Sequence, residues 1–137
     1  MNQKIKILVV GCGNMGASHA QAYHDMDGFE IVGLVSRGAS KEILNVRLEA
    51  DYPLFDDYAT ALKETQPDAV CISTYPDTHE AYAIQAFEAG AHVFIEKPLA
   101  DTVLGAQKVV EAARRANKKL VVGYISTRSV PSAWVVS

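Results

Sequence analysis

Two groups of residues in this sequence have the types and the spacing to do chemistry. The first is a glycine turn, Gly11-Cys12-Gly13-Asn14-Met15-Gly16, which directly follows the apolar run 5–10. The second is Glu96-Lys97-Pro98, at the end of the apolar run 91–95. A strand, a glycine turn and a helix in this order place dinucleotide phosphates on the N-terminus of the helix. A lysine at a strand end can polarise a carbonyl or hydroxyl oxygen during hydride transfer.

Each glycine of the turn has its own task. Gly11 allows the tight turn, and Gly13 has no Cβ, so the backbone can approach the phosphates. Gly16 lets the helix pack closely on the strand. A glycine turn alone is often a plain structural feature, but a buried-type strand precedes this one near the N-terminus. The sequence therefore favours a dinucleotide pyrophosphate site here.

The end of the second apolar run bears on which dinucleotide binds. Ser36 lies 20 positions after Gly16, where NAD-binding folds have an acid that accepts from the adenosine ribose. A hydroxyl and the guanidinium of Arg37 can bind a 2′-phosphate, which a carboxylate would repel. Lys41 adds positive charge nearby. The alternative is that Arg37 is a solvated loop residue, but the balance favours NADP, with NAD tolerated.

Lys97 is the candidate chemical residue. The proline that follows it restricts Lys97 to an extended or turn conformation, so the backbone aims the ammonium group. The structural alternative is a surface ion pair with Glu96, which is the commoner role of such a pair at a strand end.

Strand and helix patterns alternate along the chain. Apolar runs rich in β-branched residues predict strands at 5–10, 29–35, 69–72, 91–95 and 119–124, with a weaker one at 53–55. Six strands joined by crossovers predict one α/β domain, a Rossmann doubly wound parallel sheet in the order 3-2-1-4-5-6. Because ligands bind beyond the C-terminal strand ends, four clusters should line one crevice. These clusters are residues 11–16, 36–37, 73–79 and 96–98.

Two helices have a clear apolar stripe. The first stripe consists of Ala83, Ala86, Phe87 and Gly90, with Gly90 as the cap beyond the helix end. The second stripe consists of Val103, Ala106, Val110 and Ala113. Asp77 and Asp101 are the predicted N-caps of these helices.

The composition is that of an ordinary globular protein. The 137 residues are 49% hydrophobic and 21% charged, with a formal net charge of −3. We expect no nucleic-acid partner, because the chain has no basic excess, and no membrane segment, because no apolar run is long enough. Without a signal peptide, the expected location is cytoplasmic. The spacing of Cys12 and Cys71 matches no metal-binding or redox motif, so we expect no bound metal. Both cysteines are expected to be small buried side chains, with a reactive Cys12 as the alternative.

Several of these segments resemble one family. GCGNMGASH, the turn Ser73-Thr74-Tyr75-Pro76, His79, the run HVFIEKPLA and the closing LVVGY are similar to the N-terminal domain of the Gfo/Idh/MocA (glucose–fructose oxidoreductase, inositol dehydrogenase and rhizopine-catabolism) family. The resemblance covers residues 4 to about 124. It implies an NAD(P)-dependent oxidoreductase that moves hydride between nicotinamide and a sugar or polyol.

The resemblance also implies roles for individual residues. Lys97 would be the catalytic residue that contacts both nicotinamide and substrate, beside Glu96, and its bond to Pro98 can be cis. His79 would border the nicotinamide ribose, with a helix-surface role as the alternative. The other implied cofactor-binding residues are Gly11, Gly13, Asn14, Met15 and Gly16 at the pyrophosphate, Ser36 and Arg37 at the adenosine, and Ser73 and Thr74 at the nicotinamide ribose. Tyr75 and Pro76 depart from the family's threonine-proline-asparagine turn.

Family members carry a second α/β domain that supplies an aspartate and a histidine to the reaction. The resemblance implies that residues 1–124 form the dinucleotide-binding domain and 125–137 a truncated lead-in, so we expect binding without turnover. Trp134-Val135-Val136 would be exposed or docked on a neighbouring chain, and homo-oligomerisation stays open. The alternative function is a non-catalytic NAD(P)-binding sensor or partner subunit. A Rossmann domain for coenzyme A or a methyl donor is more distant, since the Glu96-Lys97-Pro98 element argues against it.

Overall fold

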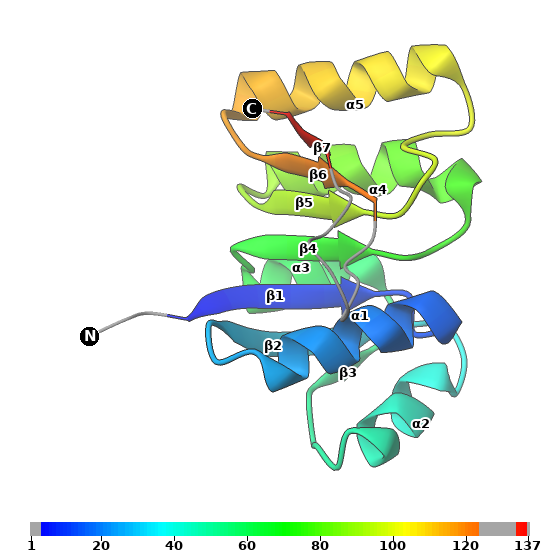
Figure 1. Ribbon diagram of the computed structural model, residues 1–137, viewed down its shortest axis with the longest axis vertical. Coiled ribbons are helices and arrows are strands. Elements are labelled where there is room, and N and C mark those ends of the chain that lie inside the picture. Colours follow the sequence, from blue (N-terminus) through cyan, green and yellow to red (C-terminus); the bar gives the residue numbers. More distant parts are fainter. Residues whose placement is uncertain (1–3, 124–133, 137) are drawn as a thin grey trace.

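A computed structural model describes residues 4–123 and the backbone of 134–136, which form one seven-stranded sheet (Figure 1). The strands are β1 (Ile5–Val10), β2 (Phe29–Val35), β3 (Leu54–Phe55), β4 (Ala69–Ile72), β5 (His92–Ile95), β6 (Leu120–Val122) and β7 (Trp134–Val136). Their order across the sheet is β3-β2-β1-β4-β5-β6-β7, and β1 to β6 are all parallel. The predicted Rossmann order 3-2-1-4-5-6 is confirmed. β7 is an additional strand that pairs antiparallel with β6.

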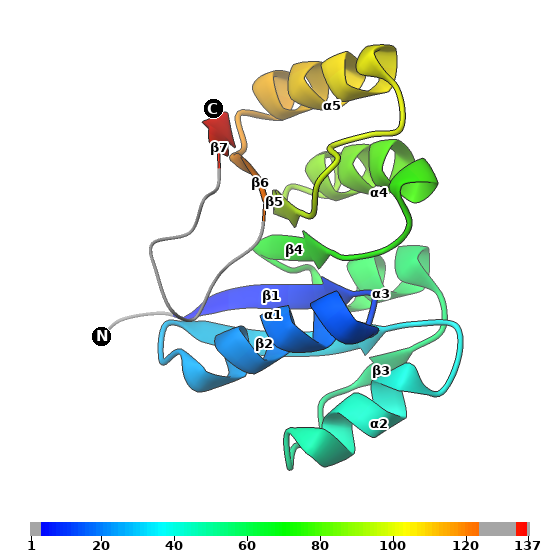
Figure 2. The ribbon, with the colours of Figure 1, turned by 45° about the vertical axis from the view of Figure 1, so that its right-hand side comes forward.

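Five helices in residues 4–123 cover the two faces of the sheet. They are α1 (Asn14–Asp25), α2 (Ser40–Arg47), α3 (Tyr58–Thr65), α4 (Pro76–Glu88) and α5 (Val103–Ala116). In Figures 1 and 2, α1 lies in front of the strands, whereas α3 and α4 lie behind them. The strand order explains why the helices lie on opposite faces. After β1 the chain moves across the sheet to β2 and β3, whereas after β4 it moves the other way to β5 and β6. Because each crossover between parallel strands is right-handed, the two halves place their helices on opposite faces.

The central strands are buried on both faces. Along β1, Ile7 and Val9 belong to the core beneath α1 and α2, whereas Leu8 and Val10 belong to the core beneath α3, α4 and α5. All four side chains are at most 2% exposed. Each such burial stabilises the fold by roughly 1.5–3 kcal/mol. Because neither face meets water, these strands appear in the sequence as continuous apolar runs.

The glycine turn joins β1 to α1 by two close approaches. Gly11 has a φ of +96°, and a Cβ there would lie 2.5 Å from the carbonyl oxygen of Ser73 at the end of β4. A Cβ at Gly16 would overlap the carbonyl oxygen of Gly11. Gly13 differs, because its Cβ would meet nothing within 4 Å. Gly11 is therefore needed for close packing against Ser73, and Gly16 for close packing against the turn itself. Of the three glycines, only Gly13 faces open space.

The two predicted N-caps were wrong. α4 begins at Pro76 after the cap residue Tyr75, so Asp77 lies inside the first turn. Proline is favoured at the first helical position because its fixed φ already suits the helix. α5 is capped by Thr102, whose hydroxyl accepts from the backbone N–H of Gly105 at 2.9 Å, one residue after the predicted Asp101. Asp and Thr are both favoured at N-caps, so the sequence alone does not decide between the adjacent residues Asp101 and Thr102.

The apolar stripe of α4 was predicted correctly, and that of α5 only in part, since Ala113 is buried and Val110 packs against the core. Ala83, Ala86 and Phe87 are buried, and Gly90 follows the helix end with a φ of +86°. In α5 the buried residues are Gly105, Val109 and Ala113, while Val103 is 77% exposed. The reason is the close packing of α5 at Gly105, where a Cβ would lie 2.6 Å from the Glu80 carboxylate.

We predict that Gly16→Ala lowers the free energy of unfolding by about 3 kcal/mol, because the added methyl group overlaps the Gly11 carbonyl. Urea denaturation measures the change. Gly13→Ala is the matched control: Gly13 has a φ of −74°, which alanine adopts, and open space around it. It should stay within about 0.5 kcal/mol of the wild type. Equal stability of the two variants would refute the packing role of Gly16.

Candidate functional site

A cavity of about 740 Å³ opens at the C-terminal ends of the parallel strands. This is the edge where a doubly wound sheet binds its ligand, and the volume is typical of a ligand pocket, roughly 300–1,000 Å³. The cavity brings together residues from the turn after β1 and the loops after β2 and β4. Among them are six of the predicted site residues, Gly11, Gly13, Ser36, Arg37, Ser73 and Thr74. Asn14, Met15, Gly16, His79, Glu96 and Lys97 do not line it.

The N-terminus of α1 borders this cavity at Gly13. Gly13 is its N-cap residue, no side chain caps its first turn, and that turn contains no acid. Asp57 caps α3 and Thr102 caps α5, while α2 and α4, which also lack a side-chain cap, have Glu42 and Asp77 in their first turns. The first N–H groups of a helix have no partner within the helix and carry partial positive charge, so they attract an anion. The open side of Gly13 lets a phosphate reach them.

Hydroxyl groups line the cavity on the β4 side. The Ser73 hydroxyl oxygen is buried and has no oxygen or nitrogen partner among the residues that the structure describes. The hydroxyls of Thr74 and Thr78 share a hydrogen bond of 2.5 Å, and that of Thr78 lies 2.6 Å from the Tyr75 carbonyl oxygen. Thr78 lies within the predicted cluster 73–79, in the first turn of α4, but it was not named among the cofactor-binding residues. The Thr74 and Thr78 hydroxyls can hydrogen-bond a polar ligand group, whereas the buried Ser73 hydroxyl would first have to turn toward the cavity.

His79 joins the loops after β4 and β5. The side chain lies on α4 but is only 1% exposed, so it is not on the helix surface. Its Nδ1 is 2.7 Å from the carbonyl oxygen of Pro98, and its Nε2 is 3.1 Å from that of Thr74. Both partners can only accept, so the ring donates to one of them when neutral and to both when doubly protonated. His79 thereby fixes the Pro98 backbone, next to Lys97, relative to the cavity wall.

Glu96 is held from α1. The Nε2 of His19, which is 4% exposed, contacts the Glu96 carboxylate. Within residues 4–123, Glu96 thus pairs with His19 and not with the neighbouring Lys97, which is exposed. The Lys97–Pro98 peptide bond is cis, as the family resemblance implied. His19 is not among the residues that the sequence predicts at the site, although its position three residues after Gly16 points it at the sheet.

The loop after β2 forms the far end of the cavity. The Ser36 hydroxyl donates to the Gly38 carbonyl at 3.1 Å and accepts from the Lys41 N–H at 3.3 Å. The Lys41 ammonium is 2.7 Å from the Asp56 carboxylate and 2.8 Å from the Gly38 carbonyl. Arg37 is exposed and lines the cavity, as does Asp56. Asp56 escaped prediction because it follows β3, the strand with the weakest sequence signal.

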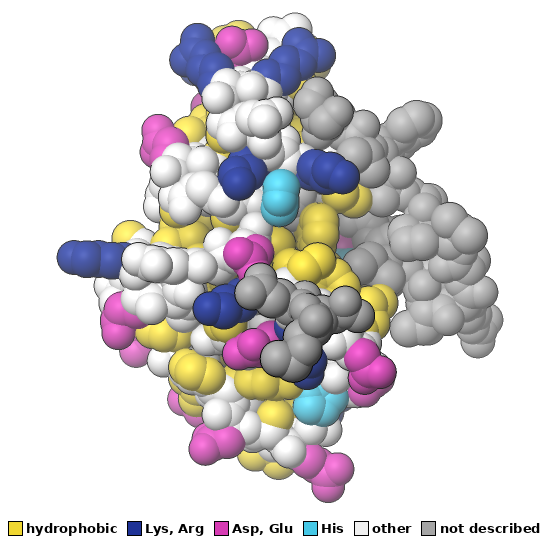
Figure 3. Space-filling view, turned by 90° about the vertical axis from the view of Figure 1, so that its left-hand side faces the viewer, with side chains coloured by type: hydrophobic (Ala, Val, Ile, Leu, Met, Phe, Trp, Pro, Cys, Tyr) yellow, Lys and Arg dark blue, Asp and Glu magenta, His cyan; other side chains and the backbone are white. Residues whose placement is uncertain are grey.

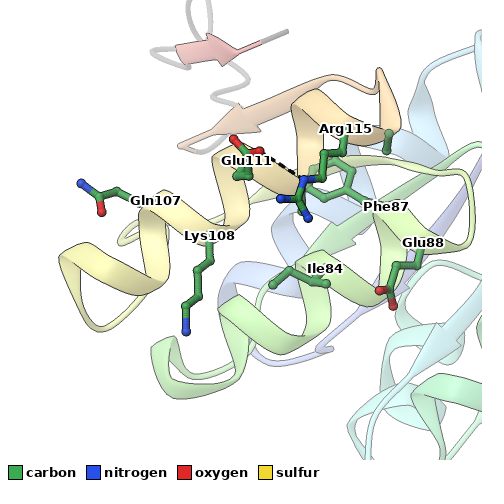
Figure 4. Close-up of a pocket in the computed structure, with 9 residues that line it drawn as sticks. Ile84, Phe87, Glu88, Gln107, Lys108, Glu111 and Arg115 are labelled. Atoms are coloured by element: carbon green, nitrogen blue, oxygen red, sulfur yellow. Dashed lines mark hydrogen bonds and ion pairs between the residues drawn. The ribbon is translucent and has the colours of Figure 1, made fainter.

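A second hollow of about 750 Å³ lies between α4 and α5 (Figure 4). Ile84 and Phe87 of α4 face Lys108 and Arg115 of α5 across it, and Arg115 pairs with Glu111 at 3.1 Å. These residues lie in the later part of α4, which returns toward the edge where the strands begin. The hollow is therefore remote from the strand ends that carry the candidate chemistry.

A smaller hollow of about 380 Å³ is lined by residues of α5 alone. Figure 3 shows the edge where the strands begin, on which positive and negative side chains are interspersed. Within the described ranges, no cluster of His, Cys, Asp and Glu could hold a metal ion. None of the helices that the structure describes is both long and apolar enough to cross a membrane.

We predict that neither cysteine is alkylated by iodoacetamide in the folded chain at pH 7.5. Burial raises the pKa of the Cys12 thiol to about 11 and that of Cys71 to about 12. The reactive thiolate of Cys12 is then about one part in a thousand even at pH 8, and the rate should rise about tenfold per pH unit below pH 11. The urea-unfolded chain is the control. Rapid alkylation of folded Cys12 at pH 7.5 would support the reactive alternative.

Comparison with known proteins identifies this architecture. Residues 5–124 match the family described as "Oxidoreductase family, NAD-binding Rossmann fold", Gfo/Idh/MocA. Inositol 2-dehydrogenase from Paracoccus denitrificans is 34% identical over 125 residues, which cover 88% of this chain and 37% of that protein. Glycosyl hydrolase family 109 protein 2 from Akkermansia muciniphila is also 34% identical, over 84% of this chain and 26% of that protein.

The fold matches solved structures of the same kind. Scyllo-inositol dehydrogenase from Lactobacillus casei, with bound NAD(H) and scyllo-inositol, has a TM-score of 0.81 and 25% identity over 88% of this chain and 36% of that chain. The chain thus spans about a third of the length of the proteins it matches. One of these relatives is named a dehydrogenase and the other a glycosyl hydrolase. Similarity over the part of their length that this chain covers therefore does not define the reaction. The match over residues 5–124 shows that the chain belongs to the Gfo/Idh/MocA oxidoreductase family and has its NAD-binding Rossmann fold.

Proposed function

We propose that this chain binds a nicotinamide dinucleotide for an oxidoreductase that transfers hydride to or from a sugar or polyol. The observation that carries the proposal is the uncapped N-terminus of α1, which meets the cavity at Gly13. The inositol dehydrogenases among its relatives support the substrate class. Because the chain spans about a third of their length, the reaction and the substrate are part of the proposal.

The chain's own residues position the dinucleotide along the cavity. The first N–H groups of α1 bind the pyrophosphate, with Gly13 giving the phosphates access. Asn14, Met15 and Gly16 contribute their backbone in the same turn. The hydroxyls of Ser73 and Thr74 hydrogen-bond the ribose on the nicotinamide side.

At the reacting end, Lys97 holds the substrate oxygen. A bound nicotinamide ring supplies the acceptor or donor of the hydride. The Lys97 ammonium donates a hydrogen bond to the oxygen on the carbon that loses or gains hydride, which stabilises the charge that develops there. The His19 ring contacts the Glu96 carboxylate, and the His79 ring lies within hydrogen-bond distance of the Pro98 carbonyl. Lys97 is therefore presented by a backbone held on both sides. We expect this domain alone to bind the cofactor without appreciable turnover.

The choice between NAD and NADP has support on both sides. The exposed guanidinium of Arg37 lines the cavity and can bind a 2′-phosphate, which supports the NADP preference proposed from the sequence. The relative from Lactobacillus casei holds NAD(H). Asp56 adds a carboxylate to the same end of the cavity, which opposes a 2′-phosphate. A cytoplasmic location agrees with the free thiols of Cys12 and Cys71.

We predict that NADH binds with micromolar-scale affinity and that Gly13→Ala weakens it at least about tenfold without lowering the melting temperature. The methyl group would occupy the space through which the phosphates approach. Fluorescence titration of NADH measures the affinity. Gly28→Ala is the control, since Gly28 is exposed with open space around it and lies in the α1–β2 loop. A wild-type chain that binds neither NADH nor NADPH would rule out the proposed function.

We predict that Lys97→Ala leaves NADH affinity within about twofold in this chain, because the pyrophosphate site is untouched. In a protein that joins this domain to a substrate domain, the same change should lower kcat on the order of 10²–10⁴-fold. Steady-state kinetics on a polyol panel would measure it. Lys108→Ala, an exposed lysine of α5, is the control. An unchanged kcat would remove Lys97 from the reaction.

A further inference from the structure

We infer that Asp56 is the residue that selects the dinucleotide: its carboxylate binds the adenosine ribose and disfavours a 2′-phosphate, so that the chain prefers NAD to NADP. The inference rests on the proposed dinucleotide binding. Ser36 and Arg37 alone led us to expect a preference for NADP. Asp56, which follows the neighbouring strand β3, reverses that preference.

The register of the sheet sets Asp56 beside Ser36. Val35 of β2 pairs with Phe55 of β3, and the Ser36 N–H donates to the Phe55 carbonyl at 3.2 Å. Asp56 is the next residue, at the same C-terminal edge of the sheet. NAD-binding folds have an acid at the end of β2, where this chain has Ser36. Here the end of β3 supplies an acid to the same part of the cavity.

The Asp56 carboxylate is both accessible and oriented. Its side chain is 80% exposed and lines the cavity. One carboxylate oxygen, Oδ1, accepts from the Lys41 ammonium at 2.7 Å. Lys41 is nearly buried and is anchored by the Gly38 carbonyl at 2.8 Å, so the ion pair fixes the carboxylate. The other oxygen, Oδ2, is then presented to accept from a ribose hydroxyl.

Of the three groups expected near a 2′-phosphate, Ser36 and Lys41 are already engaged, and Arg37 is opposed by Asp56. The Ser36 hydroxyl has one proton, which it donates to the Gly38 carbonyl. The Lys41 ammonium lies against Asp56 and, at 3.5 Å, Glu42. Hydrogen bonding to Asp56 raises the pKa of Lys41, so the Lys41 ammonium is charged at neutral pH. Arg37 remains as the cation for a phosphate, and the Asp56 carboxylate opposes it.

The test is a comparison of NADH and NADPH affinities for the 137-residue chain, by fluorescence titration at fixed ionic strength. We expect the wild type to bind NADH about tenfold more tightly, and Asp56→Asn to move the ratio about tenfold toward NADPH. Raising the salt concentration should reduce the wild-type ratio, because it screens the repulsion. Asp56 is exposed, so the variant should fold, and a thermal melt checks this.

Two further variants separate charge at this position from other effects. Glu64→Gln makes the same change in net charge at the far end of α3, and it should leave the ratio unchanged. Lys41→Met keeps an unbranched apolar side chain in the buried position but leaves Asp56 uncompensated, so discrimination against NADPH should increase. A structural effect of Asp56 would instead weaken both dinucleotides equally and leave the ratio unmoved.

The possible failures are distinct. Binding of both dinucleotides with an Asp56→Asn ratio equal to that of the wild type overturns the inference alone. So does a wild type that prefers NADPH, which would favour Arg37 as the deciding residue. Binding of neither dinucleotide overturns the inference together with the proposed function.

Discussion

The candidate site depends on the contact between the start of α1 and the turn that precedes it. Gly16 lies so close to the Gly11 carbonyl that no side chain fits between them, and a side chain at Gly11 would meet the carbonyl of Ser73, which follows β4. These contacts bring the N-terminus of α1 to the switch point of the sheet, where β1 has neighbours on both sides. Gly13 then lies in open space at the mouth of the cavity. The same packing that stabilises the turn thus leaves an anion-binding helix end accessible.

Two buried histidines extend this arrangement to the end of β5. His19 reaches from α1 to the Glu96 carboxylate, and His79 reaches from α4 to the Pro98 carbonyl. Lys97 lies between the two contacted residues and is itself exposed. A catalytic side chain gains from such support, because its backbone is placed before the substrate arrives. The proposed hydride chemistry therefore depends on residues that never touch the substrate.

The sequence predicted the fold better than the site. The strands were found because both faces of the sheet are buried, so that β1 and β4 are unbroken apolar runs. The glycine turn was found because its spacing follows from the backbone geometry it must adopt. Asp56 was not assigned, and Lys41 was expected only to add positive charge near Arg37, because their contact joins the ends of different elements and has no periodic signal. Likewise, Thr102 rather than Asp101 is the N-cap because α5 begins one residue later than predicted. Capping propensity does not resolve a difference of one residue, since both types are favoured at N-caps.

The central claim is that a dinucleotide binds across the C-terminal strand ends with its phosphates on α1. The most direct measurement is a map of backbone amide NMR shifts of the ¹⁵N-labelled chain on titration with NADH. The account predicts that the largest shifts fall on residues 11–16, with further shifts at 36–38 and 73–74 and little change in α5. Shifts confined to the hollow between α4 and α5, or no shifts at saturating NADH, would contradict it.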